Sequence, residues 1–120
     1  RRHARLMLDR IERDGKLSRD FVYPLQTWKF GGDSLLLVAM GGEVVVDYTR
    51  LLEKAFPGKD LWVAGYCNDV SAYIPSRRIL SEGGYEAGGA MLYFGWPSSF
   101  EPAVEDAILE SVAGLAAGEK

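Results

Sequence analysis

The 120 residues give room for one domain and are enough to bury a hydrophobic core. Apolar residues make up 48% and charged residues 26% of the chain, which are ordinary values for a globular domain and exclude a disordered polymer. The net charge is −3, and no basic cluster is longer than a pair of arginines. We therefore expect no nucleic-acid partner, because neutralising phosphates requires a basic face.

The cysteine content and the apolar runs exclude further classes. Cys67 is alone, so the chain forms no internal disulfide and no cysteine-based zinc cluster, and we expect a small buried apolar residue there. No apolar run approaches the ~18 residues of a membrane-spanning helix, so we expect no transmembrane segment, and we identify no signal in the chain. Because the sequence starts on Arg1 in what resembles the middle of a helix, we expect a fragment of a larger protein.

The first predicted element is a helix over residues 2–14. Its apolar residues recur at helical spacing and charged residues occupy the rest of its surface, while Gly15 provides a stop signal. His3, the only histidine, lies at the start of this helix. We expect it to be a solvated surface residue, because a single histidine near a helix end makes a poor metal site.

Residues 21–30 are rich in aromatic and β-branched side chains and predict a strand. Pro24 cannot donate a backbone hydrogen bond, so it favours an edge strand or the beginning of one. Gly31-Gly32-Asp33 predicts the turn of a hairpin onto a second strand, the apolar run Leu35–Met40.

A βαβ unit follows. The strand over 35–40 leads into residues 43–56, which have helical spacing, and then into another apolar run at 61–64. A crossover of this kind makes its two strands parallel. The predicted fold is therefore α/β, a mixed sheet with an antiparallel hairpin and a parallel βαβ unit, flanked by helices, in a single domain over residues 1–120.

Three elements complete the chain. Pro75 favours a first helical turn, so we predict a short helix over 75–81 that ends at Gly83-Gly84. Residues 88–100 mix glycine with aromatic side chains and predict an ordered loop packed by its aromatics. A last helix begins near Glu101-Pro102, with its acids concentrated early, where the helix dipole favours them.

The carboxyl ends of the two parallel strands are where an open α/β sheet places its ligands. Glu43 and the segment from Tyr66 to Tyr73, which includes Asn68 and Asp69, should emerge side by side at that edge. Glu43 is either an acid in the first turn of a helix, favoured by the dipole, or a metal ligand or general base. For Asn68-Asp69 the simpler interpretation is a turn.

The tyrosines and arginines have two interpretations each. Tyr73 and Tyr85 are either packed aromatics or phenols that ligate a metal or donate to an oxyanion. Arg77 and Arg78 are either a solvated pair or contacts for a polar substrate. The glycine pairs match neither phosphate-binding motif, and one histidine near a helix start excludes a Ser-His-Asp or Cys-His arrangement within these residues.

Three ordered motifs resemble the last third of the catalytic domain of the neutral/alkaline, non-lysosomal ceramidases, most closely the bacterial ceramidase-like members. They are Gly41-Gly42-Glu43, residues 65–76 (GYCNDVSAYIPS) and Gly84-Tyr85-Glu86-Ala87-Gly88. The likeness extends roughly from Tyr23 to Leu115. Two segments, 74–76 and 87–89, depart from the usual residues of the family.

This resemblance implies a zinc-dependent amidohydrolase that cleaves the N-acyl amide bond of ceramide-like lipids. The family holds zinc with two histidines, a glutamate and a tyrosine, and Glu43 and Tyr73 match the last two. Tyr85 matches a tyrosine that stabilises the tetrahedral oxyanion. The histidines would lie upstream, so the implied zinc site is incomplete and the chain is not expected to be active without the rest of the parent catalytic domain.

Two alternatives stay open. The first is a related hydrolase that acts on a different amide or ester. The second is a non-catalytic α/β interaction module that packs on a partner through the aromatics of residues 93–100. The cellular compartment also stays open, and one expectation is that the parent protein is secreted or periplasmic.

Overall fold

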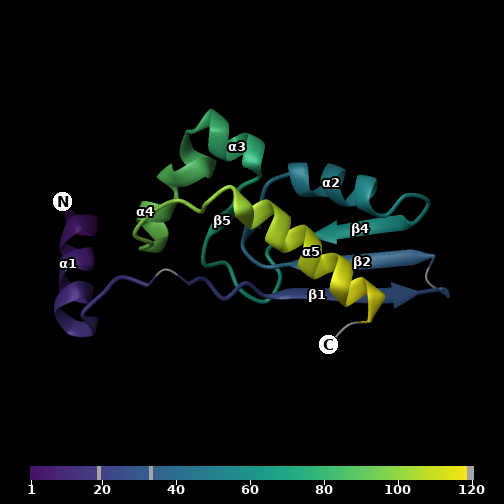
Figure 1. Ribbon diagram of the computed structural model, residues 1–120, viewed down its shortest axis with the longest axis horizontal. Coiled ribbons are helices and arrows are strands. Elements are labelled where there is room, and N and C mark those ends of the chain that lie inside the picture. Colours follow the sequence, from purple (N-terminus) through teal and green to yellow (C-terminus); the bar gives the residue numbers. More distant parts are fainter. Residues whose placement is uncertain (19, 33, 119–120) are drawn as a thin grey trace.

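The protein is described by a computed structural model that covers residues 1–18, 20–32 and 34–118 (Figure 1). The elements, in chain order, are α1 (Arg2–Asp14), β1 (Leu25–Phe30), β2 (Leu35–Met40), β3 (Glu43–Val44), α2 (Asp47–Ala55), β4 (Asp60–Ala64), β5 (Tyr73–Ile74), α3 (Arg77–Glu82), a π-helical turn η1 (Tyr85–Gly89), α4 (Met91–Phe94) and α5 (Ala103–Ala117). This arrangement confirms the predicted mixed α/β fold.

A three-stranded sheet with the order β1-β2-β4 forms the centre of the fold. β1 and β2 are antiparallel, with Leu25 opposite Met40, and β2 and β4 are parallel, with Leu36 opposite Leu61. β1 begins directly after Pro24 and lies at the edge of the sheet, as predicted. In the hairpin connection Gly31 and Gly32 have positive φ. Asp33, the third residue of the predicted turn, lies outside the described residues.

Helices α2 and α5 bury one face of this sheet. Leu36, Val38 and Met40 of β2 are at most 1% exposed and belong to the same buried cluster as Tyr48 of α2 and Val112 of α5. Figure 1 shows α5 lying across the strands of the sheet. Every second residue of β2 therefore faces the helices, which is the two-residue period of a strand.

The opposite face of the sheet remains open in the described part of the chain. Trp28, Leu37 and Trp62 stand directly opposite one another across the three strands, and the two tryptophans are 53% and 63% exposed. Phe30, two residues after Trp28 and therefore on the same face, is 48% exposed. The sheet thus presents a row of large apolar side chains to its surroundings.

The predicted helix over 43–56 begins later than expected. Glu43 and Val44 form β3, which pairs in parallel with β5 as a second, two-stranded sheet, and α2 begins only at Asp47. The backbone explains the difference: the amide of Glu43 donates to the carbonyl of Ala72, and the amide of Val45 donates to that of Ile74. The interpretation of Glu43 as a first-turn helix acid was therefore wrong, and Asp47 holds that position.

Two single-residue expectations were also wrong. His3 is half-buried rather than solvated, and its Nε2 lies 2.7 Å from the carbonyl oxygen of Trp96. Cys67 is half-buried rather than fully buried, and its thiol donates to the backbone carbonyls of Ala64 and Gly65. The contact of His3 is to a distant segment, which helical periodicity does not report.

Residues 88–100, predicted as a loop, contain the last two residues of η1 and all of α4. The expectation of aromatic packing was correct for Trp96 and Phe100, whose rings lie 5.0 and 5.2 Å from that of Phe21. Tyr93, in contrast, is 82% exposed. Among the described residues, no helix is both long and apolar enough to cross a bilayer.

Candidate functional site

The two-stranded sheet β3–β5 sets Glu43 beside Tyr73. The two residues are register partners in parallel strands, so their side chains leave the sheet on the same face. The Tyr73 hydroxyl donates a hydrogen bond of 2.5 Å to Glu43 Oε1. The two residues that resemble metal ligands of the ceramidase family are therefore in direct contact, although they are thirty positions apart in the sequence.

A dense set of backbone hydrogen bonds fixes the approach to β3. The amide of Gly42 donates to the carbonyl of Asp69 at 2.7 Å, and the carbonyl of Gly42 accepts from the amide of Tyr66 at 2.9 Å. Gly42 has φ of 72°, and a Cβ there would lie 2.7 Å from the carbonyl oxygen of Ala72. Only glycine fits this position, since any side chain would both strain the backbone and push β5 away from β3.

Tyr85 joins the pair from the π-helical turn η1. Its ring packs edge-to-face on Tyr73, with 5.5 Å between the ring centroids and 76° between the ring planes. Gly83 and Gly84 enter this turn with φ of 78° and 91° and ψ of −158°, a region that is almost restricted to glycine. Tyr85 is 49% exposed, so it remains in contact with solvent.

Tyr66 is a fourth member to which the sequence analysis gave no role. It follows β4 directly and has φ of 58°, the left-handed region that a bulky residue rarely adopts. Hydrogen bonding to the nearby Glu43 carboxylate, then burial and the charge of Glu43, raise the pKa of the Tyr66 phenol above its ordinary value. The available signal was its place at the carboxyl end of a parallel strand, next to Glu43 in the predicted topology.

The same carboxylate controls the protonation of Tyr73. Its hydrogen bond to Glu43, partial burial and the negative charge of Glu43 all raise the pKa of the Tyr73 phenol, in that order of size. The phenols of Tyr66 and Tyr73 thus both hold their protons at neutral pH. A phenolate at Tyr73 would require a cation near the site to offset the carboxylate charge.

The oxygens of Glu43 and Tyr73 fit part of a zinc site. Zinc accepts carboxylate oxygen, and catalytic zinc sites usually have three protein ligands and an open position. Within residues 1–18, 20–32 and 34–118, no group of three or more His, Cys, Asp or Glu residues is arranged to hold a metal. These segments offer two oxygen ligands at one point, and a complete site would need further ligands from elsewhere.

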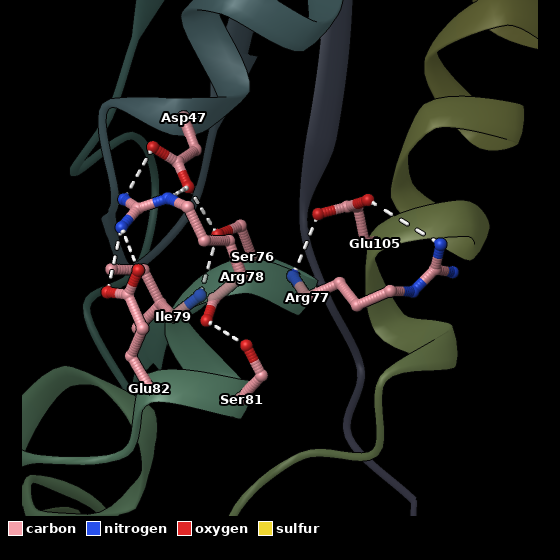
Figure 2. Close-up of polar contacts among 8 residues, drawn as sticks. All are labelled: Asp47, Ser76, Arg77, Arg78, Ile79, Ser81, Glu82 and Glu105. Atoms are coloured by element: carbon pink, nitrogen blue, oxygen red, sulfur yellow. Dashed lines mark hydrogen bonds and ion pairs between the residues drawn. The ribbon is translucent and has the colours of Figure 1, made fainter.

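A polar cluster directly after β5 ties the end of this strand to α2 (Figure 2). Asp47, with a side chain only 12% exposed, accepts a 2.5 Å hydrogen bond from Ser76 Oγ and two 2.9 Å bonds from the Arg78 guanidinium. The hydrogen bonds from Arg78 and then from Ser76 lower the pKa of the Asp47 carboxyl. Ser76 also caps α3 by accepting from the amide of Ile79.

The side chains of Arg77 and Arg78 are 51% and 54% exposed, in agreement with the predicted solvated pair, and each also forms ion pairs. Arg78 bridges Asp47 and Glu82, while Arg77 bonds to Asp106 at 2.5 Å and to Glu105 through its backbone amide. Their contacts tie α3 to α2 and α5. They support the strand that carries Tyr73 rather than a ligand.

Each of the four side chains of the candidate site provides one chemical group. Glu43 supplies a carboxylate, Tyr73 supplies a phenol that bonds to it, Tyr66 supplies a phenol near it, and Tyr85 supplies a phenol beside Tyr73. Asn68 and Asp69 form the turn predicted for them, with φ of 65° at Asn68.

No family model, curated protein or solved structure significantly matches the chain.

Proposed function

We propose that the chain is part of a zinc-dependent amidohydrolase that hydrolyses the N-acyl amide bond of ceramide-like lipids. The observation that carries the proposal is the contact between Glu43 Oε1 and the Tyr73 hydroxyl, with Tyr85 packed on Tyr73. The proposal assigns Glu43 and Tyr73 as metal ligands and Tyr85 as the donor to the oxyanion. The three motifs that resemble the neutral ceramidases provide the reaction class.

The chemistry follows from the groups present. Zinc, when bound, polarises an amide carbonyl and lowers the pKa of a bound water. With zinc bound, Glu43 Oε1 and the Tyr73 oxygen would both hold the metal. The Tyr73 proton would pass to solvent, and Oε1 would lose the hydrogen bond that it now accepts from Tyr73. Tyr66, whose phenol lies close enough to Glu43 for the carboxylate to raise its pKa, would act as an outer partner of this ligand.

Tyr85 has a separate role in this scheme. A protonated phenol donates a hydrogen bond to the oxygen that becomes negative when the amide carbonyl is attacked. The ring contact with Tyr73 holds the Tyr85 side chain next to the proposed metal ligands. Loss of such a donor lowers the turnover number and leaves substrate binding largely unchanged.

Zinc content measured in the parent polypeptide tests the ligand assignment. Glu43→Gln and Tyr73→Phe should each lower the zinc stoichiometry after dialysis, because each removes a ligand oxygen or its charge. Glu53→Gln and Tyr93→Phe are matched controls on exposed residues and should retain zinc. Unchanged stoichiometry in both ligand variants would remove the zinc proposal.

The activity of the same polypeptide tests the role of Tyr85. Tyr85→Phe should retain zinc and KM for an N-acyl sphingosine, while kcat falls by about 10² to 10³. Short acyl amides and esters assayed in parallel separate a ceramide-like specificity from the related hydrolase of another substrate. A Tyr85→Phe variant with unchanged kcat would exclude the oxyanion assignment.

The open face of the three-stranded sheet favours a second candidate, the non-catalytic interaction module. A parallel β2–β4 pair is usually covered on both faces, and here Trp28 and Trp62 remain exposed on one. Within the segment 93–100 that this alternative invokes, Tyr93 is 82% exposed, whereas Trp96 and Phe100 pack on Phe21. A parent sequence without zinc-type histidines upstream would favour this candidate over the amidohydrolase.

A further inference from the structure

Helices α1 and α4 form a cleft at one end of the molecule. Figure 1 shows the two helices together at the end remote from the hairpin of the main sheet. The cleft between them has a volume of about 760 Å³. Arg10 donates a 2.5 Å hydrogen bond to the carbonyl of Gly95, and His3 bonds to that of Trp96, so that α1 is held against the segment after α4.

The cleft is locally basic in an acidic chain. Arg1, Arg2 and Arg5 line it and are exposed, and in the described part of the chain none of them forms an ion pair. Asp9 is the one carboxylate among the lining residues, so three positive charges and one negative charge leave +2 in the cleft. The whole chain has a net charge of −3, so the charge of this cleft is opposite in sign to that of the chain.

The rim of the same cleft is apolar. Leu6, Leu92 and Tyr93 line it and are 39%, 54% and 82% exposed. A surface that combines arginines with exposed leucine and tyrosine matches the boundary between lipid headgroups and acyl chains. The arginines pair with anionic headgroups, and the apolar side chains enter the boundary region, where tyrosine is favoured because one end is apolar and the other polar.

We propose that the α1–α4 end is a docking surface for an anionic lipid bilayer. Charge complementarity is the argument for this occupant, because a net acidic chain would be repelled from anionic lipid unless a basic patch faces the membrane. The Tyr93 ring lies 6.2 Å from that of Tyr85, so the docking surface is continuous with the candidate site. Lipid binding itself is independent of the proposed function. Only the further step, in which docking turns the candidate site towards the membrane, rests on that function.

The open sheet face provides an internal comparison. It exposes larger apolar side chains, Trp28, Phe30 and Trp62, but its polar positions are Gln26 and Asp60 and no arginine. Simple hydrophobic adhesion would use that face, and it would be independent of the lipid charge. Docking through the α1–α4 end requires both the charge of the lipid and the arginines.

Sedimentation of the chain with lipid vesicles tests the proposal. The chain should bind vesicles of phosphatidylcholine mixed with an equal amount of phosphatidylserine, bind phosphatidylcholine alone at least tenfold more weakly, and lose binding as salt rises. Replacing Arg1, Arg2 and Arg5 by glutamine should weaken binding about 100-fold, because each arginine near such a surface contributes about fivefold.

Two further variants complete the design. Leu92→Ser with Tyr93→Ser should weaken binding about tenfold with the arginines intact. Arg13→Gln, at the far end of α1, and Trp28→Thr with Trp62→Thr, on the sheet face, are the controls and should bind as the unmodified chain does. Circular dichroism confirms that each variant is folded.

Several results would overturn the proposal. These are no binding to the mixed vesicles, equal binding to both kinds of vesicle, loss of binding only in the sheet-face variant, or binding to soluble heparin in place of vesicles, which would indicate a polyanion partner. The assay contains no zinc and no amide substrate. A negative result in the zinc measurements would therefore leave lipid docking standing, and a negative result here would leave the zinc assignment standing.

Discussion

The two sheets of this molecule are held together by different forces. The β1-β2-β4 sheet depends on apolar burial, with Leu36, Val38 and Met40 packed under α2 and α5. The β3–β5 sheet has two residues in each strand. Ile74 joins the same apolar core, but the sheet depends in addition on directional bonds, which include backbone hydrogen bonds around Gly42 and the cluster of Asp47, Ser76 and Arg78. The first sheet is a scaffold, and the second positions the candidate site.

This difference teaches where the protein tolerates change. Apolar packing is non-directional and spread over many contacts, so a core substitution alters stability without redirecting any one side chain. A hydrogen-bonded pair of two-residue strands has few contacts, so a small shift moves Glu43 relative to Tyr73. The following changes test this contrast, from the largest expected effect to the smallest.

Leu36→Ala tests the scaffold. Leu36 is 1% exposed, and its removal should lower the free energy of unfolding by about 4 kcal/mol through lost burial and the cavity that remains. Leu8→Ala, at a side chain that is 59% exposed, is the matched control and should change the free energy by less than about 0.5 kcal/mol. Urea unfolding followed by circular dichroism measures both. Similar losses in the two variants would contradict the assigned core.

Gly42→Ala tests the second sheet. The positive φ and the contact of the new Cβ with the Ala72 carbonyl should together lower the free energy of unfolding by about 3 kcal/mol. Gly58→Ala separates the two causes, because Gly58 has φ of 78° and open space around it, and should lose only about 1 kcal/mol. Equal losses in both variants would mean that the close approach of β5 to Gly42 does not affect the free energy of unfolding.

Asp47→Asn tests the polar cluster. It removes a charge that accepts three hydrogen bonds and should lower the free energy of unfolding by about 2 kcal/mol at neutral pH. Because the folded-state pKa of Asp47 is lowered, its stabilisation is complete above the unfolded pKa of about 4 and is lost as pH falls through the folded value.

Unfolding measured in urea at neutral pH and at successively lower pH checks this sign. The unmodified chain should lose more stability than the Asp47→Asn chain as the solution is acidified, so the difference between them should shrink. Glu82→Gln, which touches the same guanidinium from an exposed position, is the control and should have little effect at any pH. A difference that grows on acidification would refute the assigned cluster.

The sequence by itself determined the elements whose period is local. The apolar spacing of residues 2–14 and the run at 35–40 predicted α1 and β2, and Gly31-Gly32 predicted the hairpin. The βαβ pattern also placed Glu43 near the segment that ends in Tyr73. Each of these features depends on neighbours in the chain, and a helix or strand repeats its apolar side chains at a fixed interval.

Only the tertiary structure decided the register of Glu43 opposite Tyr73, the left-handed Tyr66 and the burial of Ser76 against Asp47. A strand of two residues has no period to recognise, and helical spacing predicted that residues 43–46 would belong to α2. Backbone hydrogen bonds to partners about thirty residues away outweighed that local preference, because an amide that is removed from water must find an acceptor wherever the fold provides one.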